Sequence, residues 1–197
     1  TGIVETYYDV RSELYENHTA NNFSVFAQAD LKFGKLGISL GGRLESNQID
    51  GGDKESIPVI RTGLNYQLLK FTHLRASYGQ GYRYPSIAEK YVSTQVGNIV
   101  IYPNDSVQSE TGWTAEIGVM QGIKIGGWRG YFDVAYFWSE YQDMLEFTFG
   151  RYGDFVPPTF GFGFKSVNIG NTKITGIDIG LNGDGRIGRL PITLFCG

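Results

Sequence analysis

Apolar and polar residues alternate with a period of two along residues 74–83. One parity carries leucine, alanine and tyrosine, and the other carries serine, glycine and arginine. Successive side chains of a β-strand point to opposite faces, so this pattern predicts a strand with one apolar and one polar face. Pro85 ends the pattern, because proline cannot donate to a strand ladder. A second alternating run follows at 113–119, after a long polar stretch.

The same alternation recurs along the chain and predicts eight strands, with a ninth possible near the N-terminus. The runs cover residues 23–32, 36–45, 59–66, 74–83, 113–119, 128–141, 174–181 and 189–196, with 3–10 as the possible ninth. Residues 11–21 are polar and predict a loop. Asn182-Gly183-Asp184-Gly185 has the composition of a tight turn.

The predicted connections alternate between short and long. Short ones occupy residues 33–37, 67–71, 121–127 and 182–188, and longer ones occupy 46–56, 84–110 and 142–164. In an antiparallel meander this alternation places turns at one rim and loops at the other, as in outer-membrane barrels. A soluble β-sandwich has no reason to show it.

The polar parity carries full charges. Its charged members are Arg43, Glu45, Arg61, Arg75, Arg83, Glu116, Arg129, Asp133 and Asp178. Strands with a charged face and a large apolar face are typical of transmembrane barrels, whose interior is polar and whose exterior meets lipid. We therefore predict an all-β fold of antiparallel transmembrane barrel strands. The charged residues either form solvated salt-bridge ladders between strands or contact a plug domain or a substrate inside the barrel.

The tryptophans provide a check on length. Trp128 and Trp138 share the outward parity and lie ten residues apart. At about 3.3 Å per residue and a tilt of about 40°, this separation spans roughly 25 Å, the height of the apolar band of such a barrel. Trp113 begins its strand directly after a long loop. All three tryptophans are therefore predicted at the membrane interface, which indole favours.

Several motifs occur in order along the predicted strand and the loop that follows it. They are Gly81-Tyr82-Arg83-Tyr84-Pro85-Ser86, Glu89, Pro103-Asn104, Ser109-Glu110-Thr111 and Glu116-Ile117-Gly118. This series resembles the barrel domain of TonB-dependent outer-membrane receptors. In that family a strand ending in G-[FY]-R-x-P, a loop and a strand start of the form P-E-x-x-x-x-E-x-G recur together. Ser109 stands where the family often has proline.

The resemblance implies a barrel of about 22 strands. Residues 1–197 would then be one portion of the barrel domain, with the plug domain and the C-terminal strand or strands outside this chain. It also implies an importer in the bacterial outer membrane for a scarce nutrient such as a siderophore, cobalamin or an oligomer. The implied partners are outer-membrane lipid, the protein's own plug, TonB acting through the plug, the nutrient and, optionally, a surface lipoprotein. Contacts with plug or substrate would come from the inward residues Arg43, Arg61, Arg75, Arg83, Glu116, Arg129 and Asp133.

Composition narrows the remaining possibilities. The 197 residues have a net charge of -3 and no basic block, which disfavours nucleic acid as a partner. No apolar run is long enough for a transmembrane helix, although barrel strands need only alternating residues. The single cysteine, Cys196, excludes a disulfide within the chain and a cysteine-rich metal site.

Other candidate chemistry is weak. His18 and His73 are isolated in sequence, and the carboxylates of residues 50–55 resemble a soluble loop more than a cation site. The aromatic loop at 151–164 suits either a capture surface or a loop folded over the barrel mouth. No catalytic arrangement stands out. We predict neither an enzyme nor a bound cofactor or metal.

Two alternatives stay open from the sequence. A complete eight-stranded outer-membrane barrel with an adhesive or structural role fits the length, but the chain ends Phe195-Cys196-Gly197 without the usual terminal aromatic residue. A soluble β-sandwich binding module would need the aromatic parity in a closed core. The alternation of loops and the tryptophan positions disfavour it.

Overall fold

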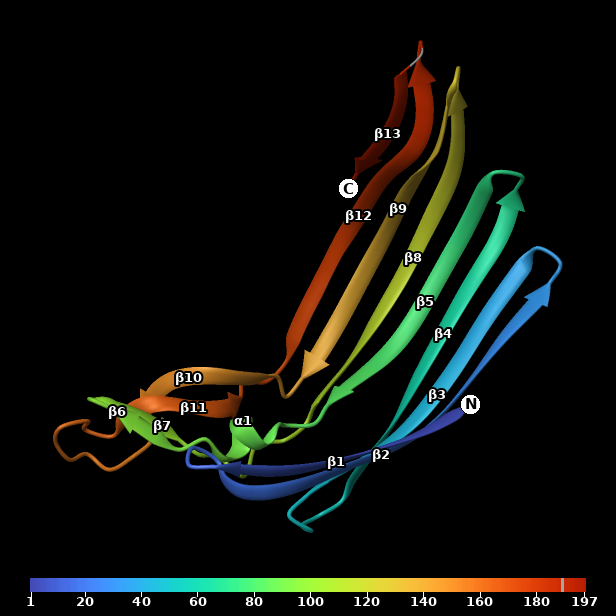
Figure 1. The fold of residues 1–197 in the computed structure, drawn as a ribbon. Helices are drawn as coiled ribbons and strands as arrows, with labels where there is room; N and C mark the ends of the chain where they lie inside the picture. The colour runs from blue at the N-terminus through green and yellow to red at the C-terminus, as the bar shows by residue number, and fades with distance from the viewer. Residues whose placement is uncertain (189) are drawn as a thin grey trace.

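The computed structural model describes residues 1–188 and 190–197. Most of these residues form one antiparallel sheet of nine strands, which curves as a wall (Figure 1). The order across the sheet is β1-β2-β3-β4-β5-β8-β9-β12-β13. The bounds are β1 (Gly2–Ser12), β2 (Glu16–Phe33), β3 (Leu36–Ile49), β4 (Glu55–Leu69), β5 (Thr72–Arg83), β8 (Glu110–Ile125), β9 (Trp128–Gln142), β12 (Thr172–Ile187) and β13 (Leu190–Cys196).

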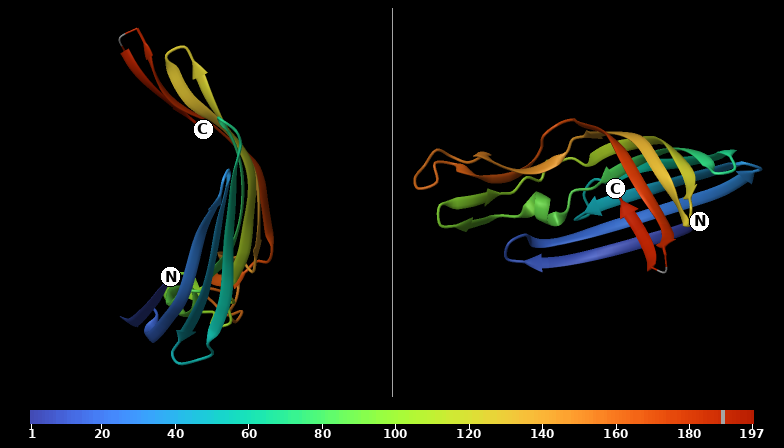
Figure 2. Two further views of the ribbon diagram at one scale, coloured as in Figure 1. Left: turned by 90° about the vertical axis from the view of Figure 1, so that its right-hand side faces the viewer. Right: turned by 90° about the horizontal axis from the view of Figure 1, so that it is seen from above.

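A second, four-stranded sheet lies beyond one end of the wall and was not predicted. Its strands are β6 (Thr94–Val96), β7 (Ile99–Tyr102), β10 (Leu145–Arg151) and β11 (Phe162–Asn168), in the order β10-β11-β7-β6. It is built from the two connections that sequence analysis treated as long loops. The short helix α1 (Ile87–Tyr91) precedes β6. The parallel pairing of β7 with β11 joins the two connections into one sheet (Figures 1 and 2).

The strand register confirms the predicted faces. Ala76 lies opposite Ile117, Ile117 lies opposite Tyr136, and Tyr136 lies opposite Ile177. The apolar parity therefore continues across four neighbouring strands without a slip. A shift of one residue would reverse every side chain of a strand, so this agreement fixes one apolar and one charged face for the wall.

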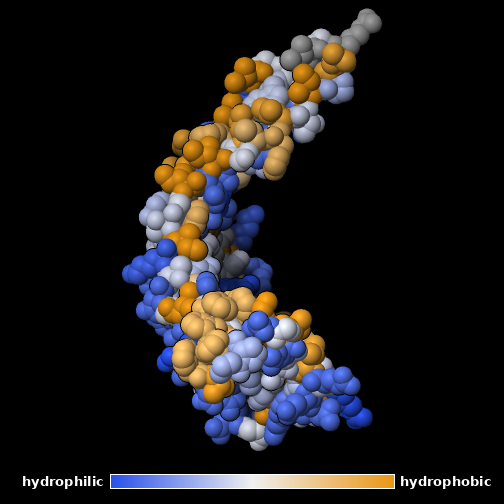
Figure 3. Space-filling model, turned by 90° about the vertical axis from the view of Figure 1, so that its left-hand side faces the viewer, coloured by the Kyte–Doolittle hydropathy of each residue, from blue (hydrophilic) through white to orange (hydrophobic). Residues whose placement is uncertain are grey.

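The apolar face of the wall has no second layer against it. Among the described residues, the buried apolar side chains are Ile49, Pro85, Val107, Ala115 and Ala135, whereas Ile117 and Ile177 are 54% and 64% exposed. In Figure 3, apolar side chains lie along the convex side and hydrophilic ones line the hollow. A soluble β-sandwich would bury this face, so that alternative is wrong. The nine described strands also do not close on themselves, as a complete eight-stranded barrel would require.

The helix α1 has five residues, and within the described ranges no helix is long and apolar enough to cross a membrane.

Two local predictions were wrong. Residues 182–185 are not a turn but continue β12, which pairs with β9 and β13. Gly183 and Gly185 instead leave room for an indole, because a Cβ added at either position would collide with atoms of Trp128. The chain turns after β12, where Gly188 has a positive φ of 63°. Residues 16–21, predicted as loop, belong to β2 and pair with β1.

Candidate functional site

Three charged residues predicted on the inward face meet across adjacent strands. Arg75 of β5 donates from Nε to Glu116 of β8 at 2.8 Å and from Nη1 to Asp133 of β9 at 2.5 Å. We call these three residues the lumen network. Their side chains are about a quarter to a third exposed, so the network lies on an open polar surface. This geometry matches the predicted salt-bridge ladder.

The other predicted residues of the wall are less connected. Arg43 forms an ion pair with Glu45 at 3.0 Å and donates a hydrogen bond to Ser24 of β2 at 3.1 Å. Arg61 lies beside Gly79, its Cγ 3.6 Å from where a Cβ would be. Within the described part of the chain, Arg61, Arg129 and Asp178 form no ion pair. Contact of any of these residues with a plug or substrate stays a prediction.

Arg83 forms a second cluster at the loop end of β5. It donates from Nε and Nη2 to the two carboxylate oxygens of Glu110 at 2.9 Å and 2.8 Å, and from Nη1 to Glu89 at 2.7 Å. We call Arg83, Glu89 and Glu110 the rim cluster. The two-pronged contact with Glu110 fits the planar guanidinium fork. The cluster ties helix α1 to the ends of β5 and β8.

The local sequence explains why α1 begins where it does. Pro85 is fully buried and ends β5. Ser86 then caps the helix: its Oγ accepts from the Glu89 N–H at 3.2 Å, and its own N–H donates to the Glu89 carboxylate at 2.8 Å. This reciprocal arrangement is a capping box, which satisfies two backbone donors that a helix start leaves unpaired. Glu89 therefore serves the helix and the rim cluster together.

The remaining motif residues connect this cluster to the second sheet and to β4. Glu110 accepts from the backbone N–H of Leu145 at the start of β10. The Asn104 side chain donates to the Ser166 carbonyl of β11 at 2.8 Å. Ser109, the departure from the family pattern, donates to Glu55 of β4 at 2.8 Å, a bond that proline could not make.

The charges of the rim cluster shift the ionisation of its members. The hydrogen bond from Arg83 lowers the pKa of Glu110 below its usual value, and the bond from Leu145 adds to this effect. Burial would raise the pKa of Glu89, but hydrogen bonds from Ser86 and Arg83 outweigh it and lower that pKa. The bonds to Glu110 and Glu89 raise the pKa of Arg83. At neutral pH all three groups are charged, with two carboxylates around one arginine.

A histidine that sequence analysis described as isolated forms a further contact at the loop end. His18 Nδ1 lies 2.6 Å from Asp50 Oδ2, and the imidazole stacks on Tyr91 of α1 with the ring centroids 3.8 Å apart. Its side chain is 10% exposed, and its Nε2 is buried without a hydrogen-bond partner among the described residues. The backbone N–H of Ser93, which follows α1, donates to the Leu14 carbonyl at 3.0 Å. Because 32 residues separate His18 from Asp50, sequence spacing gave no signal of this pair.

These contacts also account for the acidic loop at residues 50–55. Asp50 accepts from the Thr19 N–H at 2.8 Å as well as from His18, and Glu55 accepts from Ser109. Burial would raise the pKa of Asp50, but the bonds from His18 and Thr19 lower it. The described residues contain no group of three or more potential metal-ligating side chains.

The tryptophans occupy the two ends of the apolar band. Trp113 and Trp138 meet edge to face, with their centroids 6.3 Å apart, and Tyr78 and Tyr136 flank them. Trp128 lies at the turn end, opposite Ile125. This placement is the predicted one, and the interfacial role of these residues stays a prediction.

A curved antiparallel wall with an apolar exterior, a charged interior face and its loops gathered at one end matches a known family. The family model described as TonB dependent receptor-like, beta-barrel, matches residues 2–195. The chain belongs to this family. The predicted all-β barrel fold and the resemblance noted from the motifs are therefore confirmed.

Individual relatives agree with this assignment. The haemoglobin and haemoglobin-haptoglobin-binding protein A of Haemophilus influenzae is 28% identical over 123 residues, covering 59% of this chain and 11% of that protein. The haemophore receptor HasR of Serratia marcescens, solved with its haemophore and haem, superimposes with a TM-score of 0.75 at 18% identity, over 87% of this chain and 33% of that one. The FrpB iron transporter of Neisseria meningitidis (F5-1 variant) gives a TM-score of 0.60 at 20% identity, over 91% and 26%.

The chain thus spans about a tenth of the curated relative and a third or less of these solved receptors. At these identities the solved structures support the fold of the TonB-dependent receptor wall. The two solved relatives are named as a receptor and a transporter, and the Haemophilus protein is named as a binding protein.

Proposed function

We propose that this chain is a section of the barrel wall of an active importer in the bacterial outer membrane. Membership of the TonB-dependent receptor family carries the proposal. The charged inward face supports it, because a lumen lined by the lumen network, Arg43, Arg61 and Arg129 suits polar contacts with a plug and with passing cargo. Energy from the inner membrane would reach the plug through TonB and open a path along this face.

The edges of the sheet support a larger barrel. In the described residues, β1 and β13 each pair with one neighbour only. Unpaired backbone groups within hydrocarbon cost several kcal/mol each, as an order of magnitude, so spanning strands close into barrels. We propose that further strands complete the wall and that a separate plug fills it.

The cargo we propose is an iron-containing nutrient, with haem or a haem-carrying protein as the first candidate. Two relatives support this choice: the Haemophilus protein is named for binding haemoglobin, and HasR was solved with its haemophore and haem. Siderophores, cobalamin and oligomers, which the family resemblance also allows, are the other outcomes of the test.

The test deletes the whole gene and supplies single iron sources to the iron-starved deletion strain. We expect growth on haem or haemoglobin to be lost and restored by the full-length gene, and uptake to be abolished by a protonophore. If growth is lost only on a siderophore, the cargo is a siderophore rather than haem. Unchanged growth and uptake of every nutrient offered would overturn the importer.

A separate measurement tests the larger barrel. The native polypeptide in an outer-membrane fraction is run on heated and unheated gels. A band much larger than 21.9 kDa that shifts on heating is expected. A band near that mass would overturn the proposed barrel and plug.

A further inference from the structure

The second sheet presents a continuous row of phenylalanine rings to solvent. Phe147 and Phe149 of β10 and Phe162 and Phe164 of β11 share one side of the hairpin, and we call these four residues the phenylalanine face. Phe147 stacks on Phe164 with centroids 5.2 Å apart, and Phe149 stacks on Phe162 at 6.0 Å. Phe149 is 62% exposed. Figure 3 looks onto this end of the molecule and shows apolar side chains gathered there.

The opposite side of the hairpin is already covered by the chain itself. The hydroxyls of Tyr152 and Thr148 share a hydrogen bond of 2.7 Å. The Lys165 ammonium lies 5.9 Å from the centroid of the Tyr152 ring. Tyr102 packs close to Gly163 and meets Tyr152 edge to face. One side of this hairpin is therefore packed and the other has no layer of described residues against it. A rigid, exposed aromatic surface of this kind is typical of an interaction site.

The phenylalanine face ends at a pocket. The pocket has a volume of about 270 Å³ and lies between α1 and β10, with Ala88, Val92 and Phe147 among its lining residues. Interfaces commonly place one large apolar side chain of a partner in such a pocket and surround it with weaker contacts. The face and the pocket together have the form of a site for an extended partner surface.

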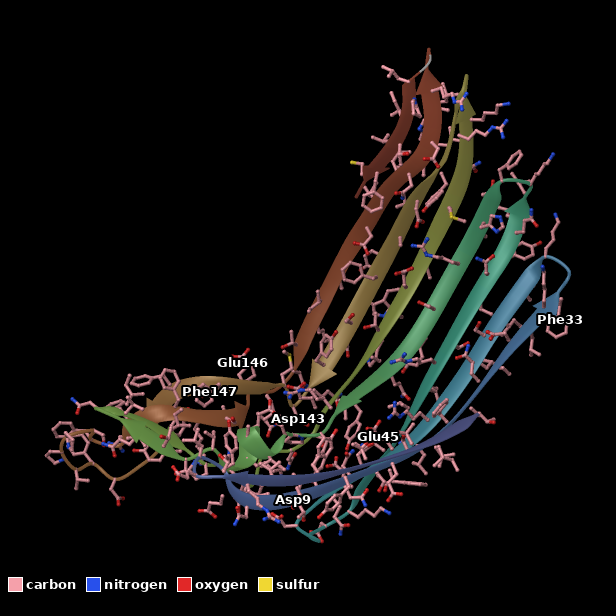
Figure 4. The ribbon with its side chains drawn as sticks, in the orientation of Figure 1. Asp9, Phe33, Glu45, Asp143, Glu146 and Phe147 are labelled. Carbon is pink, nitrogen blue, oxygen red and sulfur yellow. The ribbon has the colours of Figure 1, made fainter. Side chains whose placement is uncertain are left out.

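Around the phenylalanine face the carboxylates have no cationic partner among the described residues, whereas the cations lie against aromatic rings. Asp143, Glu146 and Asp154 are exposed and form no ion pair with any residue that the structure describes. The two cations of the hairpin are engaged with aromatic rings: Arg151 lies 5.8 Å from the Phe155 centroid, and Lys165 covers Tyr152. Figure 4 shows Asp143 where the wall ends and Glu146 and Phe147 farther out along β10. Glu146 points to the packed side of the hairpin together with Thr148, so a partner on the phenylalanine face meets the free carboxylates of Asp143 and Asp154.

The acidic character extends over the whole loop end. Residues 1–22, 45–57, 83–112 and 140–173 contain fifteen Asp and Glu against seven Lys and Arg, whereas the rest of the sequence contains five against ten. Opposite net charge on a partner increases the rate of encounter and fixes orientation. The loop end therefore favours a basic partner over an anionic one.

The face lies outside the hydrocarbon layer. Trp138 marks the loop end of the apolar band, and Phe149 follows it by eleven residues. Phe149 belongs to the second sheet, which lies beyond the loop end of the wall. The rim cluster, which is fully charged, lies between the two. These positions favour a protein partner over a lipid surface.

We infer that the phenylalanine face and its pocket are a docking surface for a protein with a basic surface that carries exposed aromatic or aliphatic side chains. The inference rests on the proposed function and deepens it: such a protein would bring cargo to the importer. The phenylalanine face would bury the partner's apolar side chains, and Asp143 and Asp154 would pair with its lysines and arginines.

The experiment uses the full-length receptor, purified in detergent and free of lipopolysaccharide. The probes are short synthetic peptides in which tryptophan alternates with lysine, tryptophan with glutamate, or alanine with lysine. We expect the tryptophan–lysine peptide to bind at least about tenfold more tightly than either of the others. The double variant Phe149→Ser with Phe162→Ser should lose this advantage. The double variant Asp143→Asn with Asp154→Asn should weaken both the binding and its salt dependence.

A matched control is Phe33→Ser, because Phe33 is 61% exposed, much as Phe149 is, but lies at the turn end. It should bind the tryptophan–lysine peptide as the wild-type receptor does. Heat-modifiable migration on gels confirms that each variant is folded. Equal binding by the Phe149→Ser, Phe162→Ser variant, or equal binding of the glutamate peptide, would overturn the inference.

A second readout distinguishes a lipid surface. The Phe149→Trp variant is placed in vesicles that contain brominated lipids, and the fluorescence of its added indole is measured. Unquenched fluorescence is expected, and quenching would assign the face to the membrane and overturn the inference. Because peptide binding needs no uptake, failure of the wild-type receptor to prefer the tryptophan–lysine peptide while nutrient import is intact would refute the docking surface alone. Intact binding without import would refute the importer alone.

Discussion

The two arginine clusters on β5 use the same chemistry in different surroundings. Arg75 and Arg83 lie eight residues apart on the same parity, and each joins two carboxylates. Arg75 links strands that a continuous backbone ladder already holds in register. Arg83 links a strand end to helix α1 and, through Glu110, to the start of β10, where few backbone bonds act. The same type of ion cluster should therefore stabilise the loop end much more than the wall.

Acidification should give the largest difference between the two regions. The pKa of Glu110, Glu89 and Asp50 is lowered in the fold. Carboxyls of this kind stabilise the fold above their unfolded-state pKa of about 4, and this contribution is lost as the pH falls through the lower folded value. Below about pH 4 we expect hydrogen exchange at the Ser93 and Asn104 amides to accelerate about 10- to 100-fold, after correction for intrinsic rates.

The amides of the β8–β9 ladder serve as the internal reference for this measurement. They should keep their protection over the same pH range. Equal acceleration in the ladder and the loop would show that acid opens the whole wall rather than the loop end.

Arg83→Gln should have the next largest effect. The substitution leaves the Glu89 and Glu110 carboxylates facing each other without a cation, so α1 should separate from the strand ends. We expect exchange at the Lys90, Ser93 and Asn104 amides to increase about tenfold, with the wall unchanged. Arg11→Gln is the control, because Arg11 is exposed and contacts Asp9 only two residues away. Protection like that of the wild type would contradict the role given to the rim cluster.

His18→Ala should have a smaller effect on the same helix. It removes the stacking on Tyr91 and the bond to Asp50, and we expect about fivefold faster exchange at Ser93. His73→Ala is the matched control, since His73 is on β5 and contacts Asn65 at 3.3 Å. If the two histidine variants behave alike, the contact of His18 with α1 has no effect on the position of the helix.

Arg75→Gln should change the structure least. The backbone ladder keeps β5, β8 and β9 in place, and the side chains of the lumen network are partly solvated, so exchange in the wall should rise less than about threefold. Arg61→Gln, at a position without an ion pair among the described residues, provides the baseline. An effect of Arg75→Gln as large as that of Arg83→Gln would remove the distinction between wall and rim.

The motif residues around α1 were only partly predictable from the sequence. The order of Arg83, Pro85, Glu89 and Glu110 indicated the family. In the structure Arg83, Glu89 and Glu110 form the rim cluster, and Pro85 is buried. The sequence did not indicate that Asn104 and Ser109 connect this cluster to β11 and β4, because those partners lie about fifty residues or more away. Backbone bonds between β7 and β11 were equally hidden, since a parallel pairing across two loops leaves no local pattern.

Eight strands of the wall, their faces and the rim at which the loops gather could be predicted from the sequence, because a period of two and the lengths of connections are local properties. It misplaced the turn after β12, because Gly183 and Gly185 make room for Trp128 and this need is visible only when β9 lies beside them. Only the tertiary structure decided the second sheet, the pairing of His18 with Asp50 and the exposed phenylalanine face. These features depend on contacts between residues far apart in the chain, and such contacts leave no periodic signal in the sequence.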